Sequence, residues 1–431
     1  MNVLRHTDPD FATRQAALTR ASSLFDPTIE SRARSIIEGV QTRGDDALLE
    51  FTERFNGAKL TADRLAISTP ELLEASLRAD DSLRAAVAMA GKNIEYFSRK
   101  SLRRRWTGRN VQGAKVGEKF DPFLRVGIYV PGGTAPLMST CLMTILLARV
   151  AGCREIVVCT PCDPSGAINP GLLFAARTAG ATELYRLGGA QAIAAMALGT
   201  ATIRPVQKVF GPGNDYVVAA KRLLFGRVAI DLLPGPSEVL VLADDSANPR
   251  FVAADLLAQA EHGSGHERVW LVTPSAKLIG KVQTEIAKQL SKLSRRKFIE
   301  RALQANGWLI QVRDLGAGIE LTNALAPEHC EIMTKQAGKV SERIVTAGAI
   351  FLGSWSPTVL GDYVAGPSHT LPTGGAGASF AGLTVDQFQR RTSVVEYNRV
   401  ALKKSLGTIQ KFAEIEGLDA HGRSAAIRSE K

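Results

Sequence analysis

The sequence predicts an α/β protein made of two Rossmann-like, doubly wound lobes, with a small N-terminal arm and a helical C-terminal tail. From Arg125 onward, short apolar strands alternate with helical patterns at the spacing of β–α–β units. The same alternation returns between Val269 and Leu352. Strands that are joined through helices in this way form parallel sheets, so each stretch predicts one lobe.

The N-terminal part of the chain is expected to be helical after an arm of residues 1–26. Apolar positions recur at helical spacing from Pro27 to Phe55, and Asn56-Gly57 ends that pattern. Helical periodicity resumes and continues to about Phe97. A basic stretch then leads into the first lobe.

The lobes are predicted from a regular series of elements. The expected strands are residues 126–130, 155–159, 183–187, 208–210, 239–242, 270–272 and 349–352. The expected helices are residues 139–150, 170–179, 190–198 and 251–262. We expect residues 128–238 to form an inserted lobe, residues 27–127 with 239–383 to form the larger lobe, and residues 384–431 to form the tail.

The composition is that of an ordinary globular protein, with 45% hydrophobic and 22% charged residues. The longest apolar stretch, Cys141 to Val150, contains Arg149 and falls well short of the ~20 residues of a membrane span. The N-terminus lacks the basic-then-apolar pattern of a secretion signal. Five cysteines, an odd number, favour a reducing compartment without a disulfide framework. We therefore expect a cytoplasmic protein that does not bind a membrane.

The chain is basic, with a net charge of +11, and its basic residues concentrate at 99–105 and 295–297. Such runs attract nucleic acids or anionic ligands in some proteins, but they are more often solvated surface. Trp106 adjoins the first run, yet no series of aromatic residues is interleaved with either run. A stacking platform for single-stranded nucleic acid is therefore not predicted.

Three loops that contain glycine follow strands in the first lobe, at residues 131–134, 211–214 and 235–238. Loops at the carboxyl ends of parallel strands line the ligand crevice of an open α/β sheet, and glycine lets backbone N–H groups approach a phosphate. Simple turn formation explains each loop equally well. No Gly-x-Gly-x-x-Gly opens a helix, so nucleotide binding is possible on these grounds but is not established by them.

Two residues with metal-binding side chains share one helix face near the end of the pattern 251–262. Gln259 and His262 are three positions apart, so both side chains can reach one ion. His266 follows, but the glycines at 263 and 265 break the helix before it. Imidazole and oxygen ligands suit Zn²⁺, Co²⁺ or Mn²⁺. Asp362 and His421 are candidate further ligands by residue type alone.

A glutamate and a histidine stand side by side in Ala326-Pro327-Glu328-His329-Cys330. Carboxyl and imidazole groups with ordinary pKa values near ~4.3 and ~6.5 can divide two proton-transfer roles between them. An unreactive surface pair is the alternative. Cys330 raises a further alternative, a cysteine nucleophile of the aldehyde-dehydrogenase kind, although only His329 stands near it in sequence to support a thiolate.

An ordered series of motifs resembles the histidinol dehydrogenase family over nearly the whole chain. The segments that carry the resemblance are residues 43–57, 126–133, 188–192, 211–214, 235–239, 259–262, 326–329, 361–363 and 416–421. The resemblance implies an enzyme that uses NAD and one zinc ion per subunit to oxidise L-histidinol, through L-histidinaldehyde, to L-histidine, in the last steps of histidine biosynthesis. It also implies a homodimer.

The resemblance assigns roles residue by residue. The implied zinc ligands are Gln259, His262, Asp362 and His421. The implied catalytic residues are Glu328, which activates water, and His329, the general base. The implied substrate contacts are Ser237, His369 and Glu416, and the implied NAD contacts are Tyr129, Gln191 and Asn214. His421 and Glu416 are expected to reach the partner subunit's site.

Two other functions remain open at this stage. A paralogous zinc- and NAD-dependent dehydrogenase of the same fold would act on another polyol, such as a sulfonated propanediol. Pro234, Cys330 and Ser368 depart from the usual family pattern, so the motifs alone do not fix fine substrate selectivity. A basic nucleic-acid-binding protein with a structural metal is the more distant alternative, and it predicts salt-sensitive DNA or RNA affinity.

Overall fold

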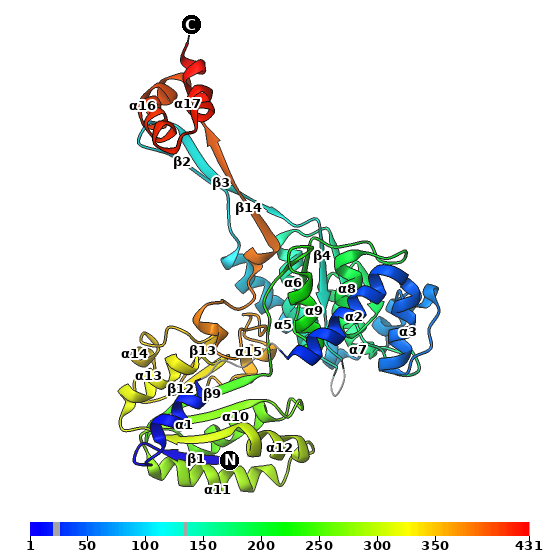
Figure 1. The fold of residues 1–431 in the computed structure, drawn as a ribbon. Coiled ribbons are helices and arrows are strands. Elements are labelled where there is room, and N and C mark those ends of the chain that lie inside the picture. Colours follow the sequence, from blue (N-terminus) through cyan, green and yellow to red (C-terminus); the bar gives the residue numbers. More distant parts are fainter. Residues whose placement is uncertain (20–25, 133–135, 431) are drawn as a thin grey trace.

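The computed structural model describes residues 1–19, 26–132 and 136–430. They form two lobes, each built on a parallel sheet, and a narrow antiparallel sheet that carries a helical tail away from both lobes (Figure 1). The predicted α/β class with parallel sheets and C-terminal helices is confirmed.

The first lobe is built on a five-stranded parallel sheet with the order β6-β5-β4-β7-β8. Its strands are β4 (Arg125–Tyr129), β5 (Glu155–Thr160), β6 (Glu183–Arg186), β7 (Lys208–Phe210) and β8 (Ala229–Ile230). Its helices are α6 (Met138–Ala151), α7 (Pro170–Ala179), α8 (Gly189–Leu198) and α9 (Asp215–Leu224). We call this the cofactor lobe, because the residues that the resemblance implies as NAD contacts, Tyr129, Gln191 and Asn214, belong to it.

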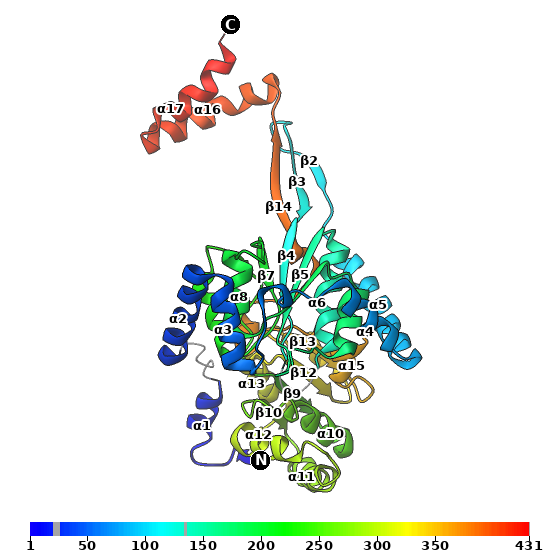
Figure 2. The ribbon, with the colours of Figure 1, turned by 90° about the vertical axis from the view of Figure 1, so that its right-hand side faces the viewer.

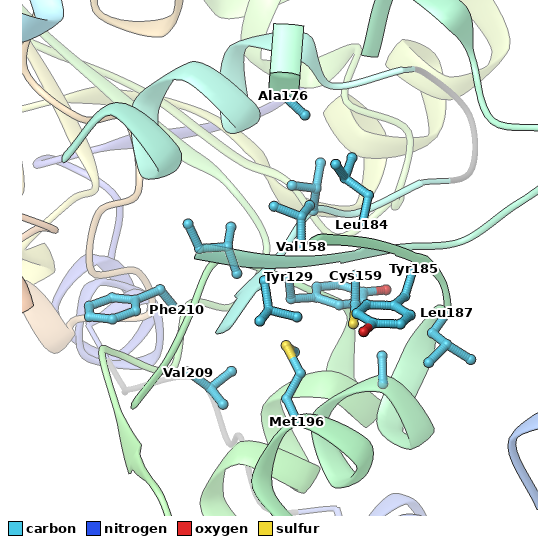
Figure 3. Packing of buried hydrophobic residues seen from close by; sticks show 14 of the residues in the cluster. Tyr129, Val158, Cys159, Ala176, Leu184, Tyr185, Leu187, Met196, Val209 and Phe210 are labelled. Atoms are coloured by element: carbon cyan, nitrogen blue, oxygen red, sulfur yellow. The ribbon is translucent and has the colours of Figure 1, made fainter. Parts of the chain in front are cut away.

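Helices cover both faces of this sheet. Ala176 of α7 and Met196 of α8 lie on opposite sides of the strands, and Val158 and Leu184 point toward the first of them (Figure 3). These side chains belong to one buried apolar cluster. Strands buried on both faces explain why the strands of this lobe read as continuous apolar runs rather than alternating ones.

The N-terminal helices pack on the cofactor lobe. They are α2 (Pro27–Arg43), α3 (Asp45–Asn56), α4 (Thr69–Arg78) and α5 (Asp81–Ser101), with a 3-10 turn, η1, at Ala62–Arg64. Helix α2 contacts α8 and α9, α4 contacts α7, and α5 contacts α6. Ile36 and Ile94 are part of the same apolar cluster as the sheet. The expected grouping of residues 27–127 with 239–383 therefore differs from the observed packing, because the apolar faces of these helices are buried against the helices of the first sheet.

The second lobe is built on a six-stranded parallel sheet with the order β1-β11-β10-β9-β12-β13. Its strands are β1 (Asn2–Arg5), β9 (Glu238–Ala243), β10 (Arg268–Thr273), β11 (Gly307–Gln311), β12 (His329–Met333) and β13 (Ala349–Leu352). Its helices are α10 (Pro249–Ala260), α11 (Ala276–Leu290), α12 (Arg296–Asn306), α13 (Leu315–Leu325), α14 (Ala337–Ser341) and α15 (Val359–Tyr363). We call this the catalytic lobe, because the residues that the resemblance implies as catalytic, Glu328 and His329, belong to it.

The N-terminal arm is part of the catalytic lobe. Asn2 to Arg5 pair in parallel with Trp308 to Gln311, and Leu4 is fully buried. A short helix, α1 (Phe11–Leu18), follows. The expected separate arm of residues 1–26 thus begins as an edge strand of the second sheet, because β11 offers it an unpaired backbone edge. Residues 20–25 of the expected arm lie outside the described residues.

The tail begins with a 3-10 turn and a strand rather than with an α-helix. Strand β14 (Gln389–Glu396) pairs antiparallel with β3 (Lys115–Pro122), which pairs with β2 (Trp106–Arg109). Short 3-10 turns, η2 (Ala376–Ala378) and η3 (Val385–Phe388), precede β14. Helices α16 (Arg399–Glu416) and α17 (Asp419–Ala426) and a last turn, η4 (Ile427–Ser429), sit at the far end of this sheet, well away from both lobes (Figures 1 and 2).

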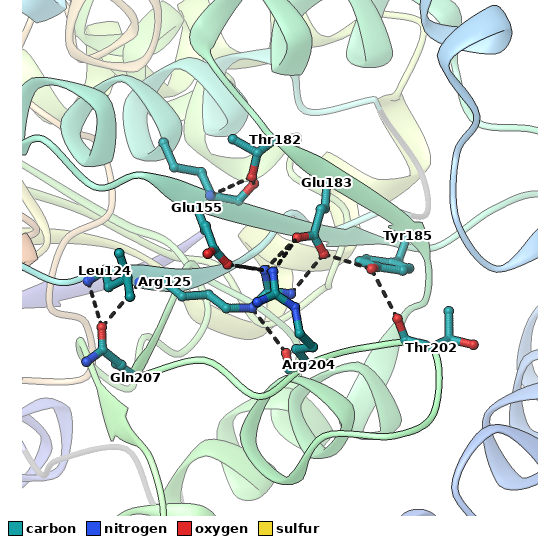
Figure 4. Close-up of polar contacts among 10 residues, drawn as sticks. Leu124, Arg125, Glu155, Thr182, Glu183, Tyr185, Thr202, Arg204 and Gln207 are labelled. Atoms are coloured by element: carbon teal, nitrogen blue, oxygen red, sulfur yellow. Dashed lines mark hydrogen bonds and ion pairs between the residues drawn. The ribbon is translucent and has the colours of Figure 1, made fainter.

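Charged side chains tie together the amino ends of the strands in the cofactor lobe. Arg125 opens β4 and donates hydrogen bonds to Glu155 Oε2 at 2.7 Å and to Glu183 Oε2 at 2.8 Å, which open β5 and β6 (Figure 4). Arg204 also donates to Glu155, at 2.8 Å. The hydrogen bond from Arg125 lowers the pKa of Glu183 to about 2, against an opposing effect of burial. This network connects the first residues of β4, β5 and β6 at the amino edge of the sheet. That edge lies opposite the loops that follow the carboxyl ends of the strands.

In the part of the chain that the structure describes, no helix is both long enough and apolar enough to cross a membrane.

Candidate active site

Two neighbouring strands of the catalytic lobe begin with ionisable residues at the same sheet edge. Glu238 opens β9 and His329 opens β12, and His329 lies opposite Val239 in the parallel register. Helix α10 follows β9 and returns in the opposite direction, as the helix of a β–α–β unit does. Its last turn, with Gln259, and the adjoining His262 therefore come back toward this amino edge.

Asp362, on α15, lies beside the same histidine. Its Oδ1 atom is 3.8 Å from Nε2 of His329. The backbone N–H of Thr358, at the start of α15, donates to Glu331 Oε1 of β12 at 2.7 Å, and Glu331 is buried. This bond fixes α15 against the strand that carries His329.

The end of α10 also faces α15. Burial raises the pKa of Tyr363, and the negative charges of Asp362 and Glu261 raise it further, so both carboxylates are close to this phenol. Glu261 stands between Gln259 and His262 in the chain. The last turn of α10 and α15 therefore lie within electrostatic range of each other.

One peptide unit orients both Glu328 and His329. Nδ1 of His329 donates to the backbone oxygen of Glu238 at 2.9 Å, and the N–H of Glu238 donates to Oε2 of Glu328 at 2.8 Å. The two side chains are 3.4 Å apart, measured from Nδ1 of His329 to Oε2 of Glu328. A proton on Nδ1 leaves the lone pair of the neutral imidazole on Nε2, which faces Asp362. The arrangement thus prepares Nε2 to accept a proton.

Burial and charge compete at the imidazole. Burial by itself lowers the pKa of His329, but the negative charges of Glu328 and Asp362 and the bonds to Glu328 and Glu238 raise it to about 9. A cation held beside Asp362 would repel the proton and move this pKa back down. The imidazole is therefore poised to respond to a bound metal.

The turn before these residues is held in an unusual conformation. Ala326 has φ +45°, and no other residue except glycine has a positive φ in residues 1–19, 26–132 and 136–430. The N–H groups of Gly348 and Ala349 donate to the backbone oxygens of Pro327 and Glu328, both at 2.9 Å. Neighbouring backbone thus holds a left-handed alanine two positions before Glu328, a conformation that is uncommon for a residue with a Cβ.

The residues predicted to bind zinc fit a cation. Nδ1 of His262 donates to the backbone oxygen of Gln259 at 3.0 Å, so its Nε2 lone pair is left for a ligand bond. Gln259 is buried, and its side-chain nitrogen has no hydrogen-bond partner among the described residues. An imidazole, an amide oxygen and a carboxylate form a donor set that zinc accepts. The negative end of the α10 dipole lies here as well.

These donors do not make a complete site within one chain. Among the described residues, no group of three or more His, Cys, Asp and Glu side chains is arranged to hold a metal ion. The predicted set contributes only His262 and Asp362 to such a count, because Gln259 is an amide. His421 and Glu416 lie on α17 and at the end of α16, exposed, at the far end of the tail (Figure 2). The structure therefore does not bring them to their own chain's site.

His369 belongs to the site, and Ser237 adjoins it. Burial lowers the pKa of His369, and Asp362 and Glu328 act on it electrostatically. Its Nε2 atom is buried without a hydrogen-bond partner in the described part of the chain. Ser237 is half-buried and directly precedes Glu238, whose backbone is bonded to Glu328 and His329. Both positions suit the predicted contacts with a substrate.

A large pocket lies at the carboxyl edge of the sheet in the cofactor lobe. Its volume is about 1090 Å³, and its lining includes Tyr129, Gln191 and Asn214, the three residues predicted to contact NAD. Tyr129 ends β4, and the other two follow β6 and β7. Crevices at the carboxyl ends of parallel strands are the usual ligand sites of open α/β sheets. Gly133 and Thr134, from the first predicted loop, lie outside the described residues.

The pocket contains polar groups that lack partners. Gln191 is 1% exposed, and neither its side-chain oxygen nor its nitrogen has a hydrogen-bond partner among the described residues. Thr160 Oγ1 is in the same state. Helix α8 begins at the pocket without a capping side chain, and the N–H of Gly189 donates to the Tyr129 hydroxyl at 3.0 Å. Buried groups of this kind and an open helix N-terminus suit a polar, anionic ligand.

Sequence reasoning missed several of these contributors. Glu238 has the most informative environment, because burial and the charge of Glu328 raise its carboxyl pKa to about 7, although Arg268 opposes this from 3.5 Å. Its position as the last residue of a predicted glycine loop was the available signal. Phe51 and Tyr216 also line the pocket. Helix α3, which carries Phe51, was assigned to the other lobe, so no sequence pattern could place it there.

The alternative based on Cys330 finds no support. Cys330 is fully buried, and burial raises the pKa of its thiol to about 12. A nucleophilic cysteine needs the opposite shift. The other four cysteines are buried and free as well. In the first basic run, Arg99 lies 3.6 Å from Glu95 and Arg103 lies 3.5 Å from Asp386, so part of its charge is neutralised locally.

Comparison with known proteins identifies relatives along the whole chain. A family model described as histidinol dehydrogenase matches residues 19–429. Curated histidinol dehydrogenases from Synechococcus sp. and Geobacillus kaustophilus are 44% and 45% identical, over 93% and 92% of this chain and 92% and 93% of their own lengths. The crystal structure of histidinol dehydrogenase from Elizabethkingia anophelis superposes with a TM-score of 0.94 at 35% identity, covering 99% of this chain and 98% of that one.

The chain therefore belongs to the histidinol dehydrogenase family, whose members are oxidoreductases acting on an alcohol and aldehyde in histidine biosynthesis. The same comparison relates the fold to an acetylating aldehyde dehydrogenase from Geobacillus thermoglucosidasius, with a TM-score of 0.50 at 16% identity. That likeness concerns the fold alone.

Proposed function

We propose that this protein oxidises L-histidinol to L-histidine through L-histidinaldehyde, with NAD as the oxidant and one zinc ion in each subunit's site. One observation carries the proposal. His329 has its Nδ1 proton fixed by the Glu238 carbonyl and its Nε2 atom directed at Asp362, among residues that suit a cation. A buried imidazole held in this way is equipped to take a proton from a substrate hydroxyl.

The residues divide the work of each oxidation. When NAD is bound in the pocket of Tyr129, Gln191 and Asn214, it supplies the hydride acceptor for each of two successive steps. His329 accepts the hydroxyl proton at Nε2 as hydride leaves the adjoining carbon. Glu328, held by the Glu238 N–H, assists the addition of water to the aldehyde, so that a second proton and a second hydride can leave the hydrate.

Zinc held by Gln259, His262 and Asp362 would polarise and orient the amino alcohol. The protein itself contributes fixed geometry. Gln259 is buried in the last turn of α10, and Asp362 is fixed through the Thr358–Glu331 bond. Ser237 and His369 border this region and would contact the substrate. Rigid supports of this kind keep reacting atoms in a near-attack arrangement.

The tail supports a homodimer in which each chain completes the other's site. His421 and Glu416 are exposed on the projecting helices, where their own chain's site does not reach them. Phe412, Ile415 and Leu418 are 59%, 68% and 40% exposed on the same segment. Apolar surface of this extent on a projecting helix pair indicates a protein interface. A second copy would cover it and receive His421 as the fourth zinc ligand and Glu416 as a substrate contact.

The test is the amount of NADH formed per L-histidinol at completion, with zinc and then with a chelator. The expected result is a four-electron oxidation, that is, a pair of NADH molecules per histidinol, lost on chelation and restored by zinc. A single NADH would contradict the two-step mechanism. Turnover of a sulfonated propanediol in preference to histidinol, compared by kcat/KM, would favour the paralogous dehydrogenase.

A further inference from the structure

A lysine and an aspartate outside the pocket form an ion pair buried inside the cofactor lobe. Lys221 on α9 and Asp231 after β8 contact each other through Nζ and Oδ1, and both side chains are fully buried. Taking two charges out of water carries a large desolvation cost, which makes such a pair a poor device for stability alone. None of the catalytic steps above uses either residue.

The pair holds both backbone groups of one glycine. Nζ of Lys221 donates to the backbone oxygen of Gly211 at 3.0 Å, and the N–H of Gly211 donates to Oδ2 of Asp231 at 2.8 Å. Gly211 has φ +108°, and a Cβ there would lie 2.1 Å from the backbone oxygen of Tyr129. The glycine is thus pinned against the strand end that supplies a pocket residue, and Asn214 follows three positions later in the same loop.

The pair also holds one of the connections between the lobes, residues 232–237. Nζ of Lys221 donates its remaining hydrogen bond to the backbone oxygen of Leu232, at 2.7 Å. Residues 232–237 run from there to Glu238, whose backbone orients Glu328 and His329. The N–H of Gly235, within this connection, is anchored to Thr373 Oγ1 at 2.5 Å. One buried ammonium therefore joins the cofactor loop to the segment that leads to the catalytic pair.

We propose that Lys221 and Asp231 are positioning residues for the redox reaction, which fix the loop of Gly211 to Asn214 relative to the inter-lobe connection that carries Ser237 and Glu238. This inference rests on the proposed binding of NAD at the pocket of Tyr129 and Gln191. Hydride transfer requires a fixed distance and orientation between the cofactor in one lobe and the substrate beside His329 in the other. Displacements of about one ångström slow such steps strongly.

The main test uses the charge-neutral double variant Lys221→Met with Asp231→Leu, which avoids leaving a lone buried charge. We expect the Kd of NAD to rise about tenfold or more, equivalent to about 1.4 kcal/mol, and kcat at saturating NAD to fall by a similar factor. Bound zinc per chain should stay at the wild-type value. A folded double variant that binds NAD and turns over within about twofold of the wild type would overturn the proposal.

A single variant and a matched control complete the design. Asp231→Asn keeps the side-chain shape, but it places an amide N–H against a donor and leaves the buried ammonium of Lys221 without its counter-charge, so it should show the same pattern at least as strongly and also lower thermal stability. Glu183→Gln disrupts the ionic network at the opposite edge of the same sheet, and should lower thermal stability without changing the Kd of NAD or kcat. If Glu183→Gln changed them as much as Asp231→Asn, a general structural effect would explain both and the proposal would fail.

Two further measurements keep the outcomes distinct. If wild-type protein does not bind NAD, or Gln191→Ala binds it equally well, the proposed pocket is wrong irrespective of the ion pair. In wild-type protein, the amide of Gly211 should resist hydrogen exchange far more than the exposed turns do. Exchange of this amide at the rate of an exposed loop would contradict the proposal that Lys221 and Asp231 fix Gly211, even if every variant failed to fold.

Discussion

The two parallel sheets of this protein use opposite edges. In the cofactor lobe, the pocket forms where β4, β6 and β7 end, and the amino edge is closed by the Arg125 network (Figure 4). In the catalytic lobe, Glu238 and His329 stand where β9 and β12 begin. The pocket of the first sheet thus lies at its carboxyl edge, and the Glu238 and His329 side chains of the second sheet lie at its amino edge.

The difference follows from what each edge offers. Carboxyl edges collect helix N-termini, whose N–H groups and positive dipole ends suit the phosphates of a cofactor. Amino edges collect helix C-termini, whose negative dipole ends suit a cation, and α10 brings Gln259 there. Each edge therefore matches the charge of the group that we propose for it, and the two functions should be separable by mutation.

The largest expected effect is at the catalytic edge. His329→Asn should lower kcat by about 10²–10⁴-fold, because the proton acceptor is lost. The Kd of NAD, measured by fluorescence quenching or calorimetry, should stay within about twofold because the pocket lies in the other lobe. A comparable loss of NAD affinity would show that the two edges do not act separately.

Removal of a zinc ligand should come next. Loss of a hydrogen bond that supports a metal ligand weakens metal binding by about 10–100-fold. Asp362→Asn changes a proposed ligand itself, so it should weaken zinc binding by more than this. Metal content after dialysis against a graded chelator measures this directly. NAD affinity should be retained in the metal-depleted protein, and zinc retention equal to the wild type would remove Asp362 from the ligand set.

The cofactor edge should show the complementary pattern. Gln191→Ala removes a buried amide that has no partner in the described residues, so it should raise the KM for NAD about tenfold, the equivalent of one good hydrogen bond. Zinc content and kcat at saturating NAD should be unchanged. Lower zinc content in this variant would show that the NAD pocket and the zinc ligands do not act separately.

The Arg125 network should affect stability and its pH dependence rather than activity. The pKa of Glu183 is about 2 in the folded protein, below its ordinary value near 4.5. Its stabilisation is therefore complete above the unfolded pKa and is lost as the pH falls from about 5 toward 2. Glu183→Gln should lower the unfolding free energy at neutral pH by about 1–3 kcal/mol and flatten its decline in acid. The unfolding free energies of the variant and the wild type can be measured by urea unfolding between about pH 5 and about pH 3. An equal decline of both free energies over this range would contradict the prediction.

The smallest effect concerns the turn before the catalytic pair. Ala326→Gly relieves a left-handed conformation that costs an alanine about 1–2 kcal/mol, but adds flexibility to the unfolded chain, so a net gain of about 0.5–1 kcal/mol is expected. Activity should change little, because Gly348 and Ala349 hold the turn by backbone bonds. A large fall in kcat would show that the alanine itself restrains the pair.

Local patterns predicted four of the five strands of the cofactor lobe, but they missed β11 and β12 of the catalytic lobe. Three elements have the predicted bounds: α7 at residues 170–179, β7 at 208–210 and β13 at 349–352. The predicted helix from Pro27 to Phe55 is two helices, because Gly44 at φ +53° breaks it. The predicted helical tail misses β14, whose pairing partner, β3, lies far away in sequence. Periodicity describes an element but not its neighbours.

The lobe assignments depended on contacts that no local pattern encodes. Residues 27–101 form amphipathic helices that suit either sheet, and the packing on α6 to α9 became visible only in the structure. The ligand and NAD residues came from motif resemblance rather than from spacing. The structure places Tyr129, Gln191 and Asn214 at one pocket, and His329 beside Asp362, while their roles stay predictions.

The sequence by itself determined the α/β class, many of the strands and helices, and the loops that end them, because these depend on hydrophobic period and on glycine and proline chemistry within a few residues. The tertiary structure decided which sheet edge each motif occupies and that Glu238 orients the catalytic pair. It also decided that Lys221 and Asp231 form a buried ion pair that is bonded to the backbone of Gly211 and Leu232. These features arise from backbone pairings and burial between residues that are distant in sequence, where side-chain type alone leaves many arrangements open.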